Sequence, residues 1–179
     1  IELTQEINLA DQVWIPIGEA GTTPFRGTLT GGTSGATISG LSSAGYTADV
    51  ANATKLSSGQ IGVSYGLIGF AENATVENIT LTNVNIDLAS SGKEMGAIVG
   101  YASGNLTIKD CAVGTASDNS SIVGLTKVGS IIGHIDARGD GIYNILIENC
   151  TNYATIKAMT TGANARAGGI IGSMYVGSA

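Results

Sequence analysis

Four segments that close on a glycine decide the fold. They are Tyr65-Gly66-Leu67-Ile68-Gly69, Gly96-Ala97-Ile98-Val99-Gly100, Gly129-Ser130-Ile131-Ile132-Gly133 and Gly168-Gly169-Ile170-Ile171-Gly172. Their closing glycines are 31, 33 and 39 residues apart along the chain. Paired apolar residues before a glycine are typical of a short buried strand that meets a turn. Recurrence at this period indicates a stacked repeat architecture, with the closing glycines in structural roles.

A second motif follows each of the first three segments and predicts a corner. It occurs in Val76-Glu77-Asn78-Ile79, Ile108-Lys109-Asp110-Cys111 and Ile147-Glu148-Asn149-Cys150, with a weaker copy in Ile38-Ser39-Gly40-Leu41. Its third residue is Gly, Asn or Asp, the types that enter the left-handed backbone region at least cost. We therefore expect a column of structural corners at Gly40, Asn78, Asp110 and Asn149. The fourth residue should then point inward, and the second should form a ladder of alternating charge on the outside.

A third short strand completes each repeat. The candidates are residues 84–86, 121–124 and 154–157. Three short strands per repeat predict an all-β solenoid of about five coils, in which each coil buries its inner face only by stacking on the next. An antiparallel β-sandwich is the alternative, but it does not need position-by-position repetition. One short helical excursion is expected over residues 47–55.

Composition excludes several other classes of protein. The chain has 179 residues, of which 43% are hydrophobic and 12% charged, with 27 glycines and a net charge of −6. Such a chain is not disordered, and its length fits one domain. Without a basic run or an apolar stretch of about 18 residues, we expect neither nucleic-acid binding nor membrane insertion.

The N-terminal third adds a pattern that resembles a known family. It contains Trp14-Ile15-Pro16-Ile17-Gly18, Pro24-Phe25-Arg26-Gly27-Thr28-Leu29, Gly31-Gly32 and Ile38-Ser39-Gly40-Leu41. Followed by the glycine-closed segments, this order resembles the GLUG-type repeat proteins, from about Leu3 to Gly172. The resemblance implies a right-handed parallel β-helix on an extracellular, adhesin-like bacterial protein. It implies no shared ligand.

We therefore expect one β-helix domain over residues 1–179, with lead-in coils at 1–45 and glycine-closed repeats at 61–179. Both ends interrupt the repeat, so the chain is expected to be a segment of a longer protein or part of an assembly. The expected function is non-catalytic recognition or adhesion at the cell surface, with a host or microbial glycan or protein as partner. The alternatives are a carbohydrate-active β-helix, either a binding module or a lyase, and a structural spacer beside another domain.

Candidate catalytic and metal-binding residues are sparse. The acids that could contribute are Asp87, Glu94, Asp110, Asp118, Asp136 and Asp140. Glycoside hydrolysis needs two carboxylates at a defined separation, and these do not fall at matching positions of neighbouring repeats. The loop Asp136–Gly141 resembles a calcium loop only faintly, because Arg138 stands where an acid would help. We expect no catalytic residue, metal or cofactor.

Two sets of residues are candidates for ligand binding. Phe70, Tyr101 and His134 follow successive closing glycines, with Ser173 in the same column. Facing outward, they would form a strip that can stack on sugar rings. Facing inward, they would fill the core, which is favoured because aromatic residues in a stacked column usually pack on each other. Arg138-Gly139-Asp140 is an integrin-type tripeptide in an expected loop, and Tyr153 is a further candidate aromatic residue.

The two cysteines, Cys111 and Cys150, share one column of adjacent repeats. Stacked coils would bring their Cα atoms to about 4.8 Å, which a disulfide can just span. The favoured interpretation is two free thiols that fill an Ile-like position, as Ile79 does one repeat earlier.

Overall fold

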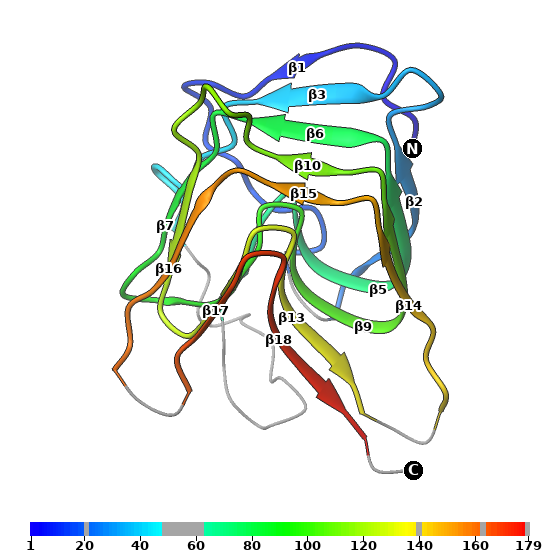
Figure 1. The fold of residues 1–179 in the computed structure, drawn as a ribbon, viewed down its shortest axis with the longest axis vertical. Coiled ribbons are helices and arrows are strands. Elements are labelled where there is room, and N and C mark those ends of the chain that lie inside the picture. The colour runs from blue at the N-terminus through cyan, green and yellow to red at the C-terminus, as the bar shows by residue number, and fades with distance from the viewer. Residues whose placement is uncertain (20–21, 48–62, 139–140, 162–163, 178–179) are drawn as a thin grey trace.

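The protein is an all-β stack of parallel strands in the computed structural model, which describes residues 1–19, 22–47, 63–138, 141–161 and 164–177. Within these ranges there is no helix, and hence none long and apolar enough to cross a membrane. The strands form four sheets, and each strand pairs with strands one repeat earlier and later (Figure 1). This confirms the expected solenoid and excludes the antiparallel sandwich.

The four sheets are numbered in the order in which one coil passes through them. The first sheet contains β1 (Ile7–Asn8), β3 (Ala36–Ser39), β6 (Ile79–Thr82), β10 (Ala112–Val113) and β15 (Thr151–Asn152). The second contains β7 (Asn85–Asp87), β11 (Ser121–Gly124) and β16 (Thr155–Ala158). The third contains β4 (Val63–Tyr65), β8 (Gly92–Met95), β12 (Lys127–Gly129) and β17 (Arg166–Gly168). The fourth contains β2 (Phe25–Thr30), β5 (Ile68–Glu77), β9 (Val99–Lys109), β13 (Ile132–Ala137) and β18 (Ile171–Val176), with β14 (Ile145–Glu148) paired to the second half of β9.

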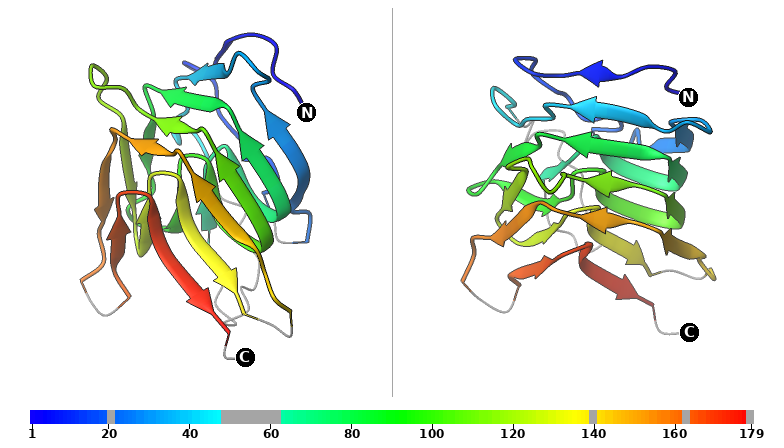
Figure 2. Two further views of the ribbon diagram at one scale, coloured as in Figure 1. Left: turned by 45° about the vertical axis from the view of Figure 1, so that its right-hand side comes forward. Right: turned by 45° about the horizontal axis from the view of Figure 1, so that its top comes forward.

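Each full coil visits all four sheets, so the expectation of three strands per coil is wrong. The additional strand precedes each glycine-closed segment and belongs to the third sheet. It is short and runs directly into the glycine bend, so the sequence pattern merges it with the following strand. The expected third strands are present as β7, β11 and β16, with Asn85, Ser121 and Thr155 in register. Successive coils lie one above another between the two ends of the chain (Figure 2).

The glycine-closed segments form sharp bends between the third and fourth sheets. Strands β17 and β18 show this bend as an inverted V near the centre of Figure 1. A Cβ added at Gly100 would lie 2.6 Å from the backbone nitrogen of Tyr65, and one at Gly172 would lie 2.6 Å from the carbonyl oxygen of Gly133. Real Cβ atoms do not approach backbone so closely, so any other residue would push adjacent coils apart.

The corner motif adopts the left-handed backbone conformation. The φ angles are 57° at Asn78, 52° at Asp110 and 52° at Asn149. The Asn149 side-chain amide donates a hydrogen bond of 2.9 Å to Asp110 Oδ1, which ties neighbouring corners together. Gly40 also has a positive φ, of 79°, but it does not belong to this column.

The placement of Gly40 corrects the sequence alignment. Ser39 pairs with Thr82, so Gly40 follows in register with Asn83, which forms the next corner along the coil and has a φ of 52°. The physical reason is the five-residue turn 31–35, which stands in the first coil where Asn78 alone turns the chain in the second. The motif copy at residues 38–41 is therefore displaced by one strand.

The main hydrophobic core is enclosed by the four sheets. Aliphatic columns run along it from coil to coil, as with Val76 beside Ile108 and Ile86 beside Ile122, all fully buried. Stacking places like residues beside like, so each coil completes the burial of its neighbour. The expected helical excursion at 47–55 lies, beyond Thr47, outside the described residues.

Candidate functional site

The third and fourth sheets bury a second set of side chains on the faces that point away from the main core. Along β4, β8 and β12 the core residues are Tyr65, Met95 and Val128. Successive side chains of a strand point to opposite faces. The residues that alternate with them therefore lie inside the V that the third and fourth sheets form at the glycine bends. We call this set the V cluster; it consists of Ser64, Glu94, Lys127 and Arg166 from the third sheet and Phe70, Tyr101, His134, Asp136, Arg138, Ser173 and Tyr175 from the fourth.

An aromatic column forms one side of the V cluster. Phe70, Tyr101, His134 and Ser173 are in register on β5, β9, β13 and β18. The ring centroids of Phe70 and Tyr101 are 5.3 Å apart, and those of Tyr101 and His134 are 5.5 Å apart. His134 also packs edge-on against Tyr175 at 4.6 Å. These separations are those of favourable aromatic pairs.

A charged column forms the other side of the V cluster. Ser64, Glu94, Lys127 and Arg166 occupy matching positions of β4, β8, β12 and β17. Lys127 Nζ lies 3.2 Å from Glu94 Oε1, and the two side chains are only 12% and 2% exposed. The Ser64 hydroxyl also donates to this carboxylate, at 3.4 Å. Burial raises the pKa of Glu94, while Lys127 opposes that rise and favours the carboxylate.

The carboxylate of Asp136 is the second one that has hydrogen-bond partners within the V cluster. The Tyr101 hydroxyl donates to Asp136 Oδ2 at 3.0 Å. Arg138 reaches the same carboxylate with both Nη2, at 2.6 Å, and Nε, at 2.8 Å. This two-pronged contact fits the planar guanidinium fork. Asp136 is only 5% exposed, so the ion pair is partly shielded from water.

His134 is neutral at physiological pH. Burial is the main cause that lowers its pKa, to about 4, and the nearby Lys127 lowers it further. Its Nδ1 lies 3.1 Å from the carbonyl oxygen of Ser173, which only accepts hydrogen bonds. The neutral ring therefore carries its proton on Nδ1 and donates it to that carbonyl.

Three cationic side chains surround the ring of Tyr175. The charged groups of Lys127, Arg138 and Arg166 lie 5.0, 4.8 and 5.4 Å from the ring centroid. Arg166 Nη1 also donates to the Tyr175 hydroxyl at 2.9 Å, and this hydrogen bond lowers the pKa of Tyr175. Cations within about 6 Å of an aromatic ring are attracted by its electron-rich face.

The sequence-predicted ligand residues fall partly in this cluster. Phe70, Tyr101 and His134 are 3%, 7% and 1% exposed, so the outward strip for sugar rings is wrong. They are buried as core residues would be, but they face away from the main core. Arg138 is exposed and holds Asp136, whereas Gly139 and Asp140 lie outside the described residues. Tyr153 is 55% exposed, on the turn between β15 and β16.

Among the described residues, the cysteines and Asp136 do not form a common reactive site. Cys111 and Cys150 are free thiols, and burial raises the pKa of Cys111 to about 12. Asp136 lies in β13 rather than in a loop, where it pairs with strands β9 and β18, and its carboxylate is held by Tyr101 and Arg138. Among the described residues, no group of three or more His, Cys, Asp or Glu side chains could hold a metal ion.

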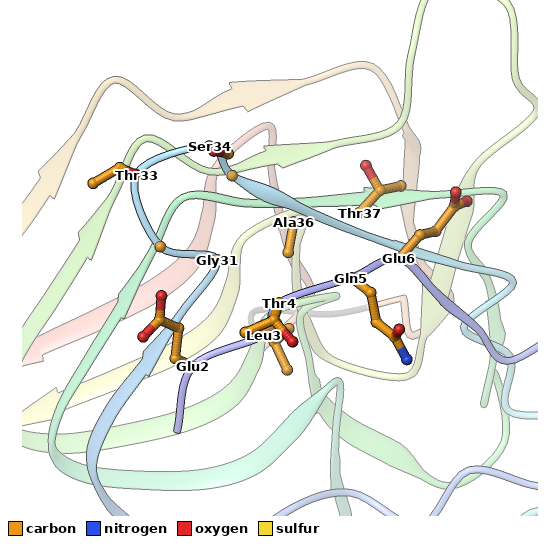
Figure 3. A pocket seen from close by; sticks show the side chains of 12 residues that line it. Glu2, Leu3, Thr4, Gln5, Glu6, Gly31, Thr33, Ser34, Ala36 and Thr37 are labelled. Carbon is orange, nitrogen blue, oxygen red and sulfur yellow. The ribbon is translucent and has the colours of Figure 1, made fainter.

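Outside the V, the outer faces of the first sheet and of the later part of the fourth sheet carry repeated hydroxyls. Thr28, Thr75 and Thr107 are in register on β2, β5 and β9, and Thr37 pairs with Thr80 across β3 and β6. Charged residues extend the fourth sheet, where Lys109 Nζ lies 3.6 Å from Glu148 Oε2. This pair is part of the expected ladder. An open pocket of about 400 Å³ lies at the N-terminal end, between residues 2–6 and 31–37 (Figure 3).

The charged column was not predicted from the sequence, although the positions of its residues follow a regular pattern there. Ser64, Glu94, Lys127 and Arg166 each stand two residues before the first glycine of a glycine-closed segment. Aligning the four segments further upstream would have placed them side by side.

No protein-family model, curated protein or solved structure matches this chain.

Proposed function

We propose that the protein is a non-catalytic, adhesin-like recognition module that acts at a cell surface. The observation that carries this proposal is the in-register array of hydroxyls on the outer faces of the first and fourth sheets. Stacked strands repeat at about 4.8 Å, so each column offers hydroxyls at a fixed interval along the coil axis. A surface of this kind suits an extended saccharide or peptide, each of which also repeats its polar groups.

Rigidity and valency support the proposal. Thr28, Thr75 and Thr107 belong to three successive coils whose aliphatic cores fix their spacing. Several weak contacts on a preformed face add up without an ordering cost at each one. The resemblance to GLUG-type repeat proteins in residues 14–18 and 24–41 favours the extracellular location.

The test is retention on an array of host and plant glycans, mucin and matrix proteins, with every spot checked for cleavage. We expect saturable retention on one class of ligand and no cleaved product. Thr107→Arg should lower retention at least tenfold, because its long charged side chain interrupts the face. Thr155→Arg is the matched control, because Thr155 is exposed on the second sheet.

Cleaved product at any spot would favour the carbohydrate-active alternative and overturn the proposal. Absence of retention on every class of ligand would favour the interpretation of the protein as a structural spacer. Equal loss of retention in Thr107→Arg and Thr155→Arg would place binding elsewhere on the molecule.

A further inference from the structure

The V cluster contains a cation, Arg166, that the described residues of its own column do not neutralise. Along the third sheet, Lys127 lies beside Glu94 of the preceding coil and pairs with it at 3.2 Å. Arg166 occupies the next position, and its register partner is Lys127, another cation. Like charges directly opposite each other on neighbouring strands are destabilising.

Arg166 also has no carboxylate partner among the described residues. In the described part of the chain, the ion pairs within 4.0 Å join Arg26 to Glu72, Lys109 to Glu148, Lys127 to Glu94 and Arg138 to Asp136. In the same part of the chain, Arg166 hydrogen-bonds to two hydroxyls: its Nη1 lies 2.9 Å from Tyr175 Oη and 3.4 Å from Ser173 Oγ. Lys127 and Arg138, the other two cations around Tyr175, thus each pair with an acid, whereas Arg166 pairs with none of the acids that the structure describes.

Most of the guanidinium donors of Arg166 remain available. A guanidinium carries five N–H donors, and both hydrogen bonds of Arg166 to hydroxyls use Nη1. No fully buried side-chain nitrogen in the described residues lacks a hydrogen-bond partner, so the donors on Nε and Nη2 face solvent. Arg166 and Tyr175 are both half-buried, which leaves them reachable from the surface.

The surroundings favour an anion at this point. Lys127, Arg138 and Arg166 converge on one ring, against the two carboxylates of Glu94 and Asp136. These three are a large share of the eight Lys and Arg residues in a chain of net charge −6. A planar guanidinium fork matches a carboxylate or sulfate with two parallel hydrogen bonds.

We propose that Arg166, with Lys127, Ser173 and Tyr175 around it, binds the carboxylate or sulfate group of an acidic saccharide. The anion would accept hydrogen bonds from Nε and Nη2 of Arg166. It would also offset the repulsion between Arg166 and Lys127. This site lies inside the V, separate from the threonine columns, so it goes beyond the proposed function and does not depend on it.

Calorimetric titration with defined probes tests this proposal. The probes are trigalacturonate, a heparin hexasaccharide and 3′-sialyllactose, with lactose as the neutral saccharide and inorganic sulfate as the free anion. We expect one acidic saccharide to bind with a dissociation constant below 1 mM, near an affinity of about −4 kcal/mol or tighter. Lactose should not bind, and sulfate should bind at least tenfold more weakly.

The variants locate the site. Arg166→Gln should weaken binding of the acidic saccharide at least tenfold, and Arg166→Lys should restore part of it, because charge remains without the fork. Lys109→Gln is the control for loss of one exposed positive charge and should change binding less than twofold. Unfolding midpoints of all variants should stay near that of the wild type, which separates loss of binding from loss of fold.

Three results would overturn the proposal. The first is failure of all three acidic saccharides to bind the wild type. The second is equal weakening by Arg166→Gln and Lys109→Gln. The third is sulfate binding as tight as that of the saccharides, which would make this a site for free anions. Retention that falls in Thr107→Arg but not in Arg166→Gln would support the threonine faces alone, so the two proposals can fail separately.

Discussion

Next to the glycine bends, the strands of the third and fourth sheets bury side chains on both faces, and the two faces follow different rules. On the core face, a column keeps one kind of side chain from coil to coil, as Ala71 and Ala102 do. On the V face, a column changes its chemistry at each coil, as Glu94, Lys127 and Arg166 do. Burial on both faces is usual for parallel sheets, but it is usually apolar on both.

The difference follows from how stacked residues interact. Aliphatic side chains pack favourably against one another, so an apolar column can repeat from coil to coil without limit. Charged groups repel their like, so a buried charged column needs an acid beside each base, as Glu94 is beside Lys127. A repeat protein that buries charge must therefore break its own repeat. Arg166 is the residue at which this alternation fails.

The largest effect is expected from breaking the buried ion pair on the V face. Lys127→Met removes the positive charge but keeps most of the side-chain volume, so Glu94 is left in a site that is 2% exposed. Removing one partner of a buried pair costs about 4 kcal/mol. Urea unfolding at pH 7 should show this loss, and the double variant Glu94→Gln/Lys127→Met should recover at least half of it.

The exposed pair is the control for that experiment. Lys109→Met removes a lysine whose side chain is 42% exposed, and exposed ion pairs contribute about 0.5 kcal/mol or less. If Lys127→Met and Lys109→Met destabilise equally, the V face is open to solvent and the contrast between the two faces is wrong.

A smaller loss is expected on the core face, and it should depend on the coil. Ile108 is fully buried between neighbouring coils, so Ile108→Ala should cost about 3 kcal/mol. Ile147 occupies the same column in β14 but is half-buried, so Ile147→Ala should cost about 1 kcal/mol. Denaturant unfolding measures both. Equal costs would show that burial does not follow position in the stack.

A still smaller effect is expected from pH, through His134. Its pKa is lowered to about 4 in the folded protein from about 6.5 in the unfolded chain. The unfolded state therefore binds more protons between these values, and stability falls as the pH drops from about 6.5 to 4. The loss due to His134 should reach about 2 kcal/mol at pH 5.

His134→Phe isolates this contribution, because the phenyl ring suits an aromatic column and does not titrate. The variant should lose about 2 kcal/mol less than the wild type between pH 7 and pH 5 in urea unfolding. Identical pH profiles for the two proteins would mean that His134 is solvated in the folded state.

The parts of the fold that sequence predicts are those that repeat by identity. The closing glycines and the Asn78, Asp110 and Asn149 corners recur because backbone geometry at those points tolerates few residue types. The third sheet was not predicted because its strands are short. They share only an alternation of core and V-cluster residues, not a residue type. Gly40 was misplaced because the turn 31–35 replaces a one-residue corner, and residue type alone cannot distinguish two corners that both need positive φ.

The V cluster could not be predicted from any single repeat. Tyr101, Asp136 and Tyr175 come from three coils, and their meeting depends on the angle at which the third and fourth sheets bend. The bend brings backbone so close at Gly100 and Gly172 that an added Cβ would clash there. The aromatic column was correctly aligned, but burial on the far side of the sheet was not among the alternatives.

The most direct test of the two-faced arrangement is an NMR titration of His134, the one histidine in the chain, so its ring resonances are unambiguous. We predict cross-relaxation from the His134 ring to the rings of Tyr101 and Tyr175, and a titration midpoint near pH 4. A midpoint near 6.5 without contacts to either tyrosine would contradict the account, because the V face would then be a solvated surface.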